Sequence, residues 1–458
     1  MSTPASEIPR GRLSALRVRF EEPLRNLRSS DTAQAAGLAL AMIVNNVIAL
    51  GSTVAFAHLL NDYSALASLI SYYLILGVVG QALQVATARE AVLGTLGVGP
   101  ELIVTLKRWT RTMVGVTVVL TVGSVLLRAP IASAVGVTNY PWAAAFGIPA
   151  GCLWLELSIL RGGLQGVGDY QSVGLSLIGE QGARLVTGAA LVIVGLGVTG
   201  AYLGTPVSLA ITCVYGAVML GRAATALDRA AIPPDAPAHP DVSLWQHVKG
   251  AFVPIVALVV VAVLQNIDII AARHVFGSGT VLANSYAATA VAAKVLVWVA
   301  IGAGFYLVPE TSRRHHEGEP TLPVLARAVG IIAVCAIPVL GIYAFAGHPL
   351  LKAVFKPDQL AATDSLLILG VAFALLACTY LAIQYLLALK RTWFLIPLGL
   401  VAIAEPILLL QAPADPPGFA SVVLAVQAVA AALAFTMALR AGRRRRPAVG
   451  SNGRISQA

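Results

Sequence analysis

The sequence predicts an all-α, polytopic membrane protein with twelve transmembrane helices in two six-helix pseudo-repeat bundles around a central cavity. Three observations predict this fold. Of the 458 residues 58% are hydrophobic and 11% are charged, with a mean hydropathy of +0.82, whereas a globular domain carries about 25% charged residues. Long apolar stretches follow one another with short loops between them, and the basic residues gather in alternate loops. Helices are expected because backbone polar groups in lipid must be paired within a segment.

Each predicted span is long enough to cross a bilayer, whose core of about 30 Å takes about 20 residues of helix. The predicted spans are residues 33–60, 63–88, 110–130, 141–160, 172–196, 199–220, 250–272, 282–308, 326–348, 362–388, 392–411 and 417–439. The first two contain no Asp, Glu, Lys or Arg, whereas the third has a charge-free core of only Thr112–Leu127. The few charged residues inside spans are therefore where function should be sought.

The basic residues predict the orientation of the chain. With the N-terminus in the cytoplasm, the cytoplasmic segments hold 25 of the 31 Lys and Arg residues, Arg161 among them. This asymmetry predicts a cell inner membrane protein with both termini in the cytoplasm. The net charge of +10 is thus a topology signal rather than a nucleic-acid site. The basic ends are expected to contact anionic lipids of the inner leaflet.

A Pro-rich connection, AIPPDAPAHPDV, divides the chain into two halves. The expected parts are a basic N-terminal segment (1–32), a six-helix bundle (33–221), a linker (222–248), a second bundle (249–440) and a basic tail (441–458). The halves resemble each other, with His58 opposite His274, Glu90 opposite Glu310 and Glu180 opposite Glu405. Transporters built from repeats bind substrate near the membrane midplane, between the repeats. The repeat therefore predicts a central cavity.

Three segments carry a family resemblance: AHLLNDYSALASL, RGGLQGVGDYQ and QNIDIIAARHVFGSGTVLANSYAATAVAAKVL. With the two halves, they resemble the polysaccharide flippases of the multidrug, oligosaccharidyl-lipid and polysaccharide exporter superfamily, over residues 33–440. The resemblance implies alternating access that moves an undecaprenyl-pyrophosphate-linked glycan across the membrane, with polysaccharide polymerases or glycosyltransferases as further partners. Lipid II flippases usually carry two more C-terminal helices, so the resemblance favours the O-antigen, capsule or exopolysaccharide type.

Four residues are candidates for substrate binding: Arg184, Lys294, Asn45 and Asn46. A charge at mid-bilayer costs about 2.5–3.5 kcal/mol, so it usually faces a cavity or a partner. Arg184 follows Glu180 by four residues, which allows either an ion pair or an arginine that binds phosphate. Lys294 has no acid at helical spacing, and lysine is a point-charge partner for phosphate. The two asparagines are suited to hydrogen bonds between helices or to sugar hydroxyls.

Three acids are candidates for coupling or counter-ion roles: Glu180, Asp268 and Glu405. Asp268 is expected either to pair with Lys294 or to take up a coupling cation or proton. Glu405 is the candidate for a proton-linked site, and Glu156 is expected to pair with Arg161 near the cytoplasmic end of its helix. His315 and His316 stand on a short loop without further ligands, so no metal site is predicted.

The favoured function is a flippase for polyprenyl-pyrophosphate-linked oligosaccharide, in which Arg184 and Lys294 neutralise the pyrophosphate. No cofactor is expected, and no GxxxxGK[ST] nucleotide-binding loop occurs. A cation-coupled multidrug exporter of the same superfamily is the alternative, although many of these carry an Asp in the first helix and Ala33–Leu60 has none. A membrane glycosyltransferase or polymerase is the second alternative. The longest outer loops hold no paired carboxylates, so the sequence predicts that the protein is not an enzyme.

Overall fold

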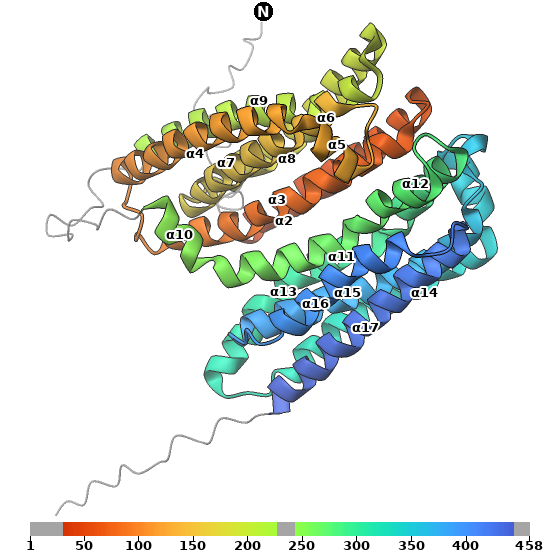
Figure 1. Cartoon of the computed structure of the whole chain (residues 1–458). Coiled ribbons are helices and arrows are strands. Elements are labelled where there is room, and N and C mark those ends of the chain that lie inside the picture. The colour runs from red at the N-terminus through yellow and green to blue at the C-terminus, as the bar shows by residue number, and fades with distance from the viewer. Residues whose placement is uncertain (1–30, 227–242, 444–458) are drawn as a thin grey trace, which may run out of the picture.

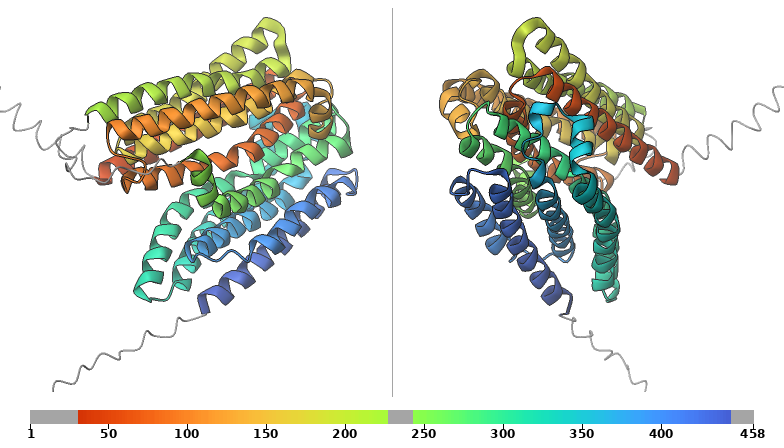
Figure 2. Two further views of the ribbon diagram at one scale, coloured as in Figure 1. Left: turned by 60° about the vertical axis from the view of Figure 1, so that its left-hand side comes forward. Right: turned by 90° about the vertical axis from the view of Figure 1, so that its right-hand side faces the viewer.

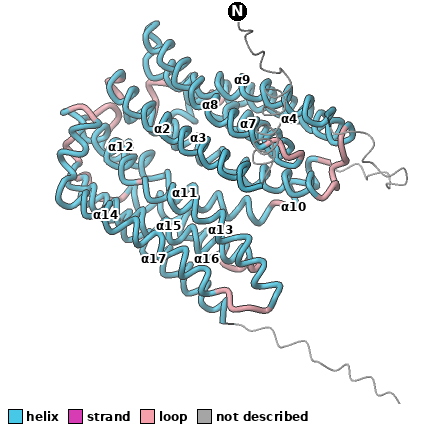
Figure 3. Tube along the Cα trace, turned by 180° about the vertical axis from the view of Figure 1, so that it is seen from behind, coloured by secondary structure: helices cyan, strands magenta, loops and turns pink. Residues whose placement is uncertain are grey.

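The computed structural model describes residues 31–226 and 243–443, and within these ranges the chain forms helices and no strand (Figure 3). The helices form two groups, the N lobe (α2–α9) and the C lobe (α11–α17), which lie one above the other in Figure 1. The predicted basic N-terminal segment, the centre of the predicted linker and most of the predicted basic tail lie outside the described residues.

The N lobe contains eight helices of unequal length. They are α2 (Asp31–Leu59), α3 (Tyr63–Val92), α4 (Pro100–Leu126), α5 (Arg128–Val135), α6 (Pro141–Ala145), α7 (Gly147–Gly166), α8 (Tyr170–Leu191) and α9 (Gly197–Ala226). Asp62 and Asp169 begin α3 and α8, because each carboxylate accepts a hydrogen bond from a backbone N–H that has no partner within the helix. A π-helical turn, Val192–Leu196, joins α8 to α9, and its Gly195 takes a φ of 102° that other residues rarely adopt.

The C lobe contains seven helices and two short 3₁₀ turns. They are α11 (Phe252–Phe276), α12 (Val281–Ala293), α13 (Val295–Glu317), α14 (Leu322–Val354), η3 (Pro357–Gln359), η4 (Thr363–Ser365), α15 (Leu366–Ala388), α16 (Leu395–Leu410) and α17 (Pro416–Arg443). The predicted span 282–308 is interrupted at Lys294, where α12 ends and α13 begins. The backbone tightens there, because Lys294 N–H bonds to the carbonyl of Val291, only three residues earlier.

In the described part of the chain, ten helical segments are long and apolar enough to cross a membrane. One of them, Tyr170–Ala223, contains both α8 and α9, and α16 is a shorter apolar helix. Counting α8 and α9 separately and adding α16 agrees with the twelve predicted spans. The third predicted span began too late, because α4 starts at Pro100 and carries Lys107, Arg108 and Arg111 on the helix. Proline is favoured at the first position of a helix, where its missing N–H costs no hydrogen bond.

The helices of the two lobes have corresponding packing partners. In the N lobe α3 and α4 pack on α7, and α2 packs on α8; in the C lobe α13 and α14 pack on α15, and α11 packs on α16. Each lobe has its own apolar core, and the core of the C lobe extends across to Ala57, Tyr63, Ala67 and Ala82 of the N lobe. This correspondence supports the predicted repeat.

The lobes meet along α3 and α11 and are closer together at one end than at the other (Figure 1). Figure 2 shows the same divergence from two further directions. The end at which the lobes converge carries the loops after α2, α11 and α14. On the predicted topology this end is extracytoplasmic, and we call it the outer end. At the opposite, inner end α2 begins and α17 finishes.

A short helix, α10 (Leu244–Gly250), connects the two lobes at the inner end. Ser243 and Gln246 form a reciprocal cap at its start, in which each side chain accepts a hydrogen bond from the backbone N–H of the other. The buried His247 ring lies 2.8 Å from Glu90 Oε2 and 3.0 Å from Thr87 Oγ1, and its centroid is 4.7 Å from that of Trp109. The start of the C lobe is therefore attached to α3 and α4.

Candidate functional site

The N lobe buries a charged cluster between α7 and α8. Glu180 lies between two arginines: its Oε2 is 3.0 Å from Arg161 Nη2, and its Oε1 is 2.5 Å from Arg184 Nη2. Arg161 Nε also donates to Ser176 Oγ at 2.8 Å, and Arg161 is only 2% exposed. We call Arg161, Ser176, Glu180 and Arg184 the N-lobe cluster. Its two guanidinium groups and one carboxylate leave one positive charge in excess.

Arg161 was predicted among the cytoplasmic residues and as the partner of Glu156, but its side chain is buried and pairs with Glu180. Residues five apart do not share a helix face, since neighbours on a face are three or four apart. Glu156 instead interacts with Thr110 of α4, and the hairpin of α7 and α8 brings Glu180 to Arg161. No local pattern in the sequence signals this pair; the next residue, Gly162, faces α3, where a Cβ would lie 2.6 Å from the carbonyl oxygen of Gln84. This helix face is thus packed closely against α3.

Arg184 is the more accessible arginine of the N-lobe cluster. Its side chain is 15% exposed, and its Nε has no hydrogen-bond partner among the described residues. The guanidinium lies 5.5 Å from the ring centroid of Tyr73, while that of Arg161 lies 5.7 Å from the centroid of Trp154. Both distances are within the range of a cation–π interaction. Arg184 is therefore the arginine of the cluster that an additional acceptor could approach.

The C lobe buries a second cluster of opposite balance, formed by Asp268, Lys294, Glu405 and Gln427. Lys294 Nζ lies 2.9 Å from Asp268 Oδ1, so the ion pair that the sequence offered as one alternative is present. Gln427 Nε2 donates to Glu405 Oε1 at 3.2 Å, whereas Glu405 Oε2 is buried and has no partner within the described ranges. We call these four residues the C-lobe cluster. It has two carboxyl groups and one ammonium group.

Asn45 and Asn46 lie on α2, and neither belongs to either cluster. Their amide groups are 3.4 Å apart and bond to each other. Asn46 is exposed, whereas Asn45 is half-buried on the side of α2 that carries the buried residues Ala41 and Ser52. The structure thus separates the asparagines from the charged candidates.

A pocket lies between the lobes near the middle of the helices. It is lined by Tyr73, Leu74, Gly77, Val78 and Gln81 of α3, Trp154 of α7, Leu258, Val261, Ala262, Gln265 and Asn266 of α11, Val297, Trp298 and Ile301 of α13, and Tyr380 of α15. None of these lining residues is charged. Arg184 and Lys294 are not among them: Arg184 lies beside the pocket residue Tyr73, and Lys294 lies within the C lobe.

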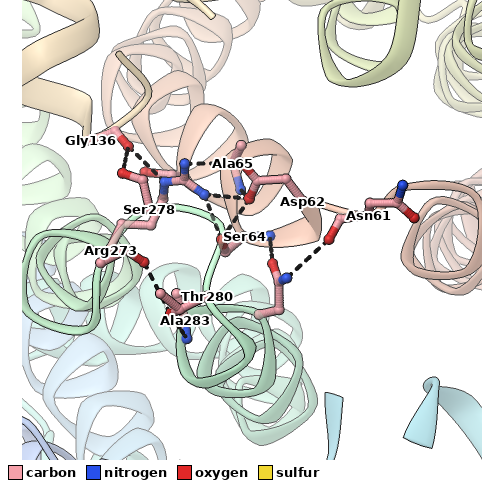
Figure 4. A network of polar contacts seen from close by, with 12 residues as sticks. Asn61, Asp62, Ser64, Ala65, Gly136, Arg273, Ser278, Thr280 and Ala283 are labelled. Carbon is pink, nitrogen blue, oxygen red and sulfur yellow. Dashed lines mark hydrogen bonds and ion pairs between the residues drawn. The ribbon is translucent and has the colours of Figure 1, made fainter. Parts of the chain in front are cut away.

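Polar contacts close the outer end between the lobes (Figure 4). Arg273, in the last turn of α11, is 1% exposed and bonds to both carboxylate oxygens of Asp62, which begins α3. The same guanidinium donates to Ser64 Oγ and, at 2.7 Å, to the carbonyl of Gly136. Asn284 of α12 accepts from Ser64 N–H at 2.8 Å and donates to Asn61 O at 3.0 Å. We call these contacts the outer closure.

Gly136 permits the close approach of Arg273. It ends α5 in the left-handed conformation with a φ of 74°, and a Cβ there would lie 3.2 Å from the Cβ of Arg273. Tyr140 lies nearby, where burial, and next the charge of Asp62, raises its pKa above the ordinary value. Asp62 and Arg273 were not predicted as functional residues, because they stand in different halves of the chain. In the ranges described, no group of His, Cys, Asp and Glu residues is arranged to hold a metal ion.

Comparison with known proteins identifies the fold. No protein-family model and no curated protein sequence matches the chain. Among solved structures, it is similar to an inward-facing multidrug resistance MATE family transporter of the MOP superfamily, with a TM-score of 0.66, 13% identity and coverage of 89% of this chain and 97% of the other. It is also similar to the lipid II flippase MurJ in an inward closed conformation, with a TM-score of 0.63, 13% identity and coverage of 88% of each chain.

A third similar structure is a MOP superfamily transporter from Pyrococcus furiosus, described as having a binding pocket of reverse polarity that suggests a different function. It has a TM-score of 0.53, 15% identity and coverage of 91% of this chain and 96% of the other. The protein therefore has the multi-pass membrane fold of MOP superfamily transporters, the superfamily indicated by the resemblance in sequence. These neighbours are transporters and flippases rather than enzymes.

Proposed function

We propose that the protein is a flippase that moves polyprenyl-pyrophosphate-linked oligosaccharide across the cytoplasmic membrane for cell-surface polysaccharide biosynthesis. The observation that carries this proposal is the excess positive charge of the N-lobe cluster. Arg161 and Arg184 share one carboxylate, and Arg184 is 15% exposed and lies beside the pocket residue Tyr73. Guanidinium offers a planar set of donors that matches phosphate oxygens. A pyrophosphate is the ligand that this arrangement would attract from the membrane surface.

The arrangement of the lobes supports a pathway from the inner leaflet. The outer closure joins the lobes through Arg273 and Asp62, and the lobes diverge towards the inner end. On one side of the interface the lobes pack together through α3 and α11. On the other side α2 packs on α8 of its own lobe, and in the part of the chain that the structure describes no comparable packing joins α2 to α13 of the C lobe. A polyprenyl tail could remain in the bilayer on that side while the polar head group enters between the lobes.

The membrane potential and Glu405 supply the direction of transport in this proposal. An inside-negative potential favours outward movement of negative charge by about 2.3 kcal/mol per charge per 100 mV. Among the described residues, the buried Glu405 has one unpartnered oxygen and no direct basic partner, so it is suited to take up a proton. Asp268 and Glu180 are counter-ions for Lys294 and the two arginines. Asn45 and Asn46 remain proposed contacts for the head group.

A cation-coupled multidrug exporter is the second candidate, because the structural similarity includes such transporters to the same degree. The excess of acid in the C-lobe cluster favours this candidate, since Glu405 and Asp268 could bind a coupling cation. The excess of arginine in the N lobe opposes it, because guanidinium groups would repel an organic cation. The absence of an acid from α2 after Asp31 also opposes it.

Transport by vesicles that contain the purified protein distinguishes the two functions. One set of vesicles carries a polyprenyl-pyrophosphate-linked trisaccharide and reports its exposure to an added lectin; the other set reports efflux of ethidium. We expect transport of the glycolipid only. Arg184→Ala and Lys294→Ala should lower the rate about 10–100-fold, because each removes a hydrogen bond to a charged group.

Arg128→Ala is the matched control, since this arginine stacks on Trp142 at the outer end, away from both clusters. It should transport at the wild-type rate. Full activity of both cluster variants would remove the proposed anion-binding mechanism. Transport of ethidium instead of the glycolipid would establish the exporter.

A further inference from the structure

The pocket between the lobes combines four aromatic rings with three amide side chains. Tyr73 and Trp154 come from the N lobe, and Trp298 and Tyr380 from the C lobe. The position of Trp154 depends on Gly80, where a Cβ would lie 2.6 Å from the Cδ1 atom of the indole. Aromatic side chains offer a flat apolar surface for a ligand, and polar groups in the pocket are needed to form hydrogen bonds with it. The amides supply those partners.

The amide groups of the pocket retain free hydrogen-bonding capacity. Asn266 Nδ2 donates to the carbonyl of Ala262, which leaves its side-chain oxygen available as an acceptor. Gln81 is exposed and Gln265 is half-buried. An amide carries both a donor and an acceptor, so these residues match a ligand whose groups do the same. Hydroxyl groups have this property.

The charges beside the pocket argue against a cationic ligand. Arg161 and Arg184 lie 5.7 Å from the Trp154 centroid and 5.5 Å from the Tyr73 centroid, respectively. Two of the four rings therefore already interact with a guanidinium group. A cationic ligand on either aromatic side chain would be repelled by the nearby guanidinium group, whereas a neutral ligand would not be repelled. The pocket thus favours a neutral, hydroxyl-rich ring over an organic cation.

We propose that this pocket binds a neutral sugar ring of the lipid-linked oligosaccharide, an inference that rests on the proposed flippase function. The ring stacks on the aromatic side chains and its hydroxyl groups bond to Gln81, Gln265 and Asn266. The pyrophosphate lies towards Arg184, on the N-lobe side. Since the aromatic residues come from both lobes, a bound sugar contacts both and couples its own binding to the closing of the lobes.

Binding of three probes to the purified full-length protein tests the inference. The probes are a citronellyl-pyrophosphate-linked trisaccharide of neutral hexoses, citronellyl pyrophosphate without sugar, and tetraphenylphosphonium. The variant is Trp298→Ala, and the matched control is Trp142→Ala, because the two residues are 51% and 50% exposed and only Trp298 lines the pocket. We expect Trp298→Ala to weaken binding of the trisaccharide probe about tenfold. Binding of the sugar-free probe should not change, and Trp298→Phe should restore most of the affinity.

The outcomes separate this inference from the function on which it rests. If Trp298→Ala weakens binding of both pyrophosphate probes equally, or of neither, the pocket does not bind the sugar. The proposed flippase function would still be supported if Arg184→Ala abolished binding of both pyrophosphate probes. Tighter binding of tetraphenylphosphonium than of the trisaccharide probe, lost in Trp298→Ala, would overturn the inference in favour of an organic cation. If the wild-type protein binds neither pyrophosphate probe, the proposed function and the sugar site both fail.

Discussion

In the N lobe two guanidinium groups flank one carboxylate, whereas in the C lobe the ammonium group of Lys294 bonds to Asp268 and the second carboxyl group, that of Glu405, bonds to Gln427. Glu180 and Glu405 occupy corresponding helices, α8 and α16, yet Glu180 bonds to two arginines and Glu405 bonds to Gln427. The same position thus has different partners in the two lobes. The N lobe is suited to bind an anion, and the C lobe is suited to take up a proton or cation.

The largest effect should come from removing the acid of the N-lobe cluster. Glu180→Gln leaves the Arg161 and Arg184 charges in the protein without their shared carboxylate. Breaking a buried ion pair from one side costs about 3–5 kcal/mol, so we expect the free energy of unfolding to fall by this amount. Unfolding in detergent, followed by tryptophan fluorescence, measures the loss.

The corresponding change in the C lobe provides the control for Glu180→Gln. Glu405→Gln should alter the free energy of unfolding by less than about 1 kcal/mol, because no basic side chain within residues 31–226 and 243–443 bonds directly to Glu405. If Glu180→Gln and Glu405→Gln lowered the free energy of unfolding by similar amounts, the difference in charge pairing between the two clusters would be contradicted.

The next largest effect concerns the Asp268–Lys294 pair. Asp268→Asn and Lys294→Met should each destabilise the protein by about 1.5–3 kcal/mol, because each removes one hydrogen bond between charged groups. The double variant should recover about 1–3 kcal/mol of the summed loss, as expected for residues in contact. Transport should stay low in the double variant, since no cation remains in the C-lobe cluster. Strictly additive losses of stability would contradict the 2.9 Å contact.

A smaller effect is expected at the outer closure, where the two lobes contact each other. Arg273→Gln removes the ion pair with Asp62 and should raise the population open at the outer end about tenfold. Spin labels at Thr138 and Gln411, in a background without the four native cysteines, report the distance between the lobes there. Arg128→Gln, at the same end but stacked on Trp142 within the N lobe, should leave the distance distribution unchanged. An unchanged distribution in Arg273→Gln would show that other contacts hold the outer end closed.

The smallest effect is expected on α2, outside both clusters. Asn46→Ala should lower the initial rate of glycolipid transport about threefold, the effect of one neutral hydrogen bond. Initial transport rates in vesicles at several substrate concentrations measure this effect. Asn45→Ala is measured in parallel, because the side-chain amides of Asn45 and Asn46 bond to each other. An unchanged rate in both variants would remove the two asparagines from the proposed head-group contacts.

The sequence predicted the all-helical membrane fold because length and apolar composition determine which segments can cross a bilayer. Boundaries were less accurate where a helix continues past the membrane, as α4 does from Pro100, or breaks within it, as at Lys294. The turn at Lys294 coincides with a tertiary contact, the ion pair of its side chain with Asp268. Local sequence does not contain that information.

The candidate site was predictable where its contacts are close in sequence. Arg184 and Glu180 stand four residues apart, and Asp268 and Lys294 lie on consecutive spans. The pair of Arg161 and Glu180 depends on how α7 packs against α8, and a basic residue at a predicted helix end resembled a topology signal. Asp62 and Arg273 are 211 residues apart, and only the packing of the two lobes brings them together.

The attachment of α10 determines where α11 can turn. His247 is bonded to Glu90 and Thr87, so a movement that preserves these bonds must bend the chain at Ala251, between α10 and α11. The 25 residues of α11 form a lever about 37 Å long, at 1.5 Å per residue. A rotation of about 10° at Ala251 would displace the far end of α11, which carries Arg273, by about 6 Å. A small change in one backbone angle is thus amplified into a displacement larger than any hydrogen bond can span.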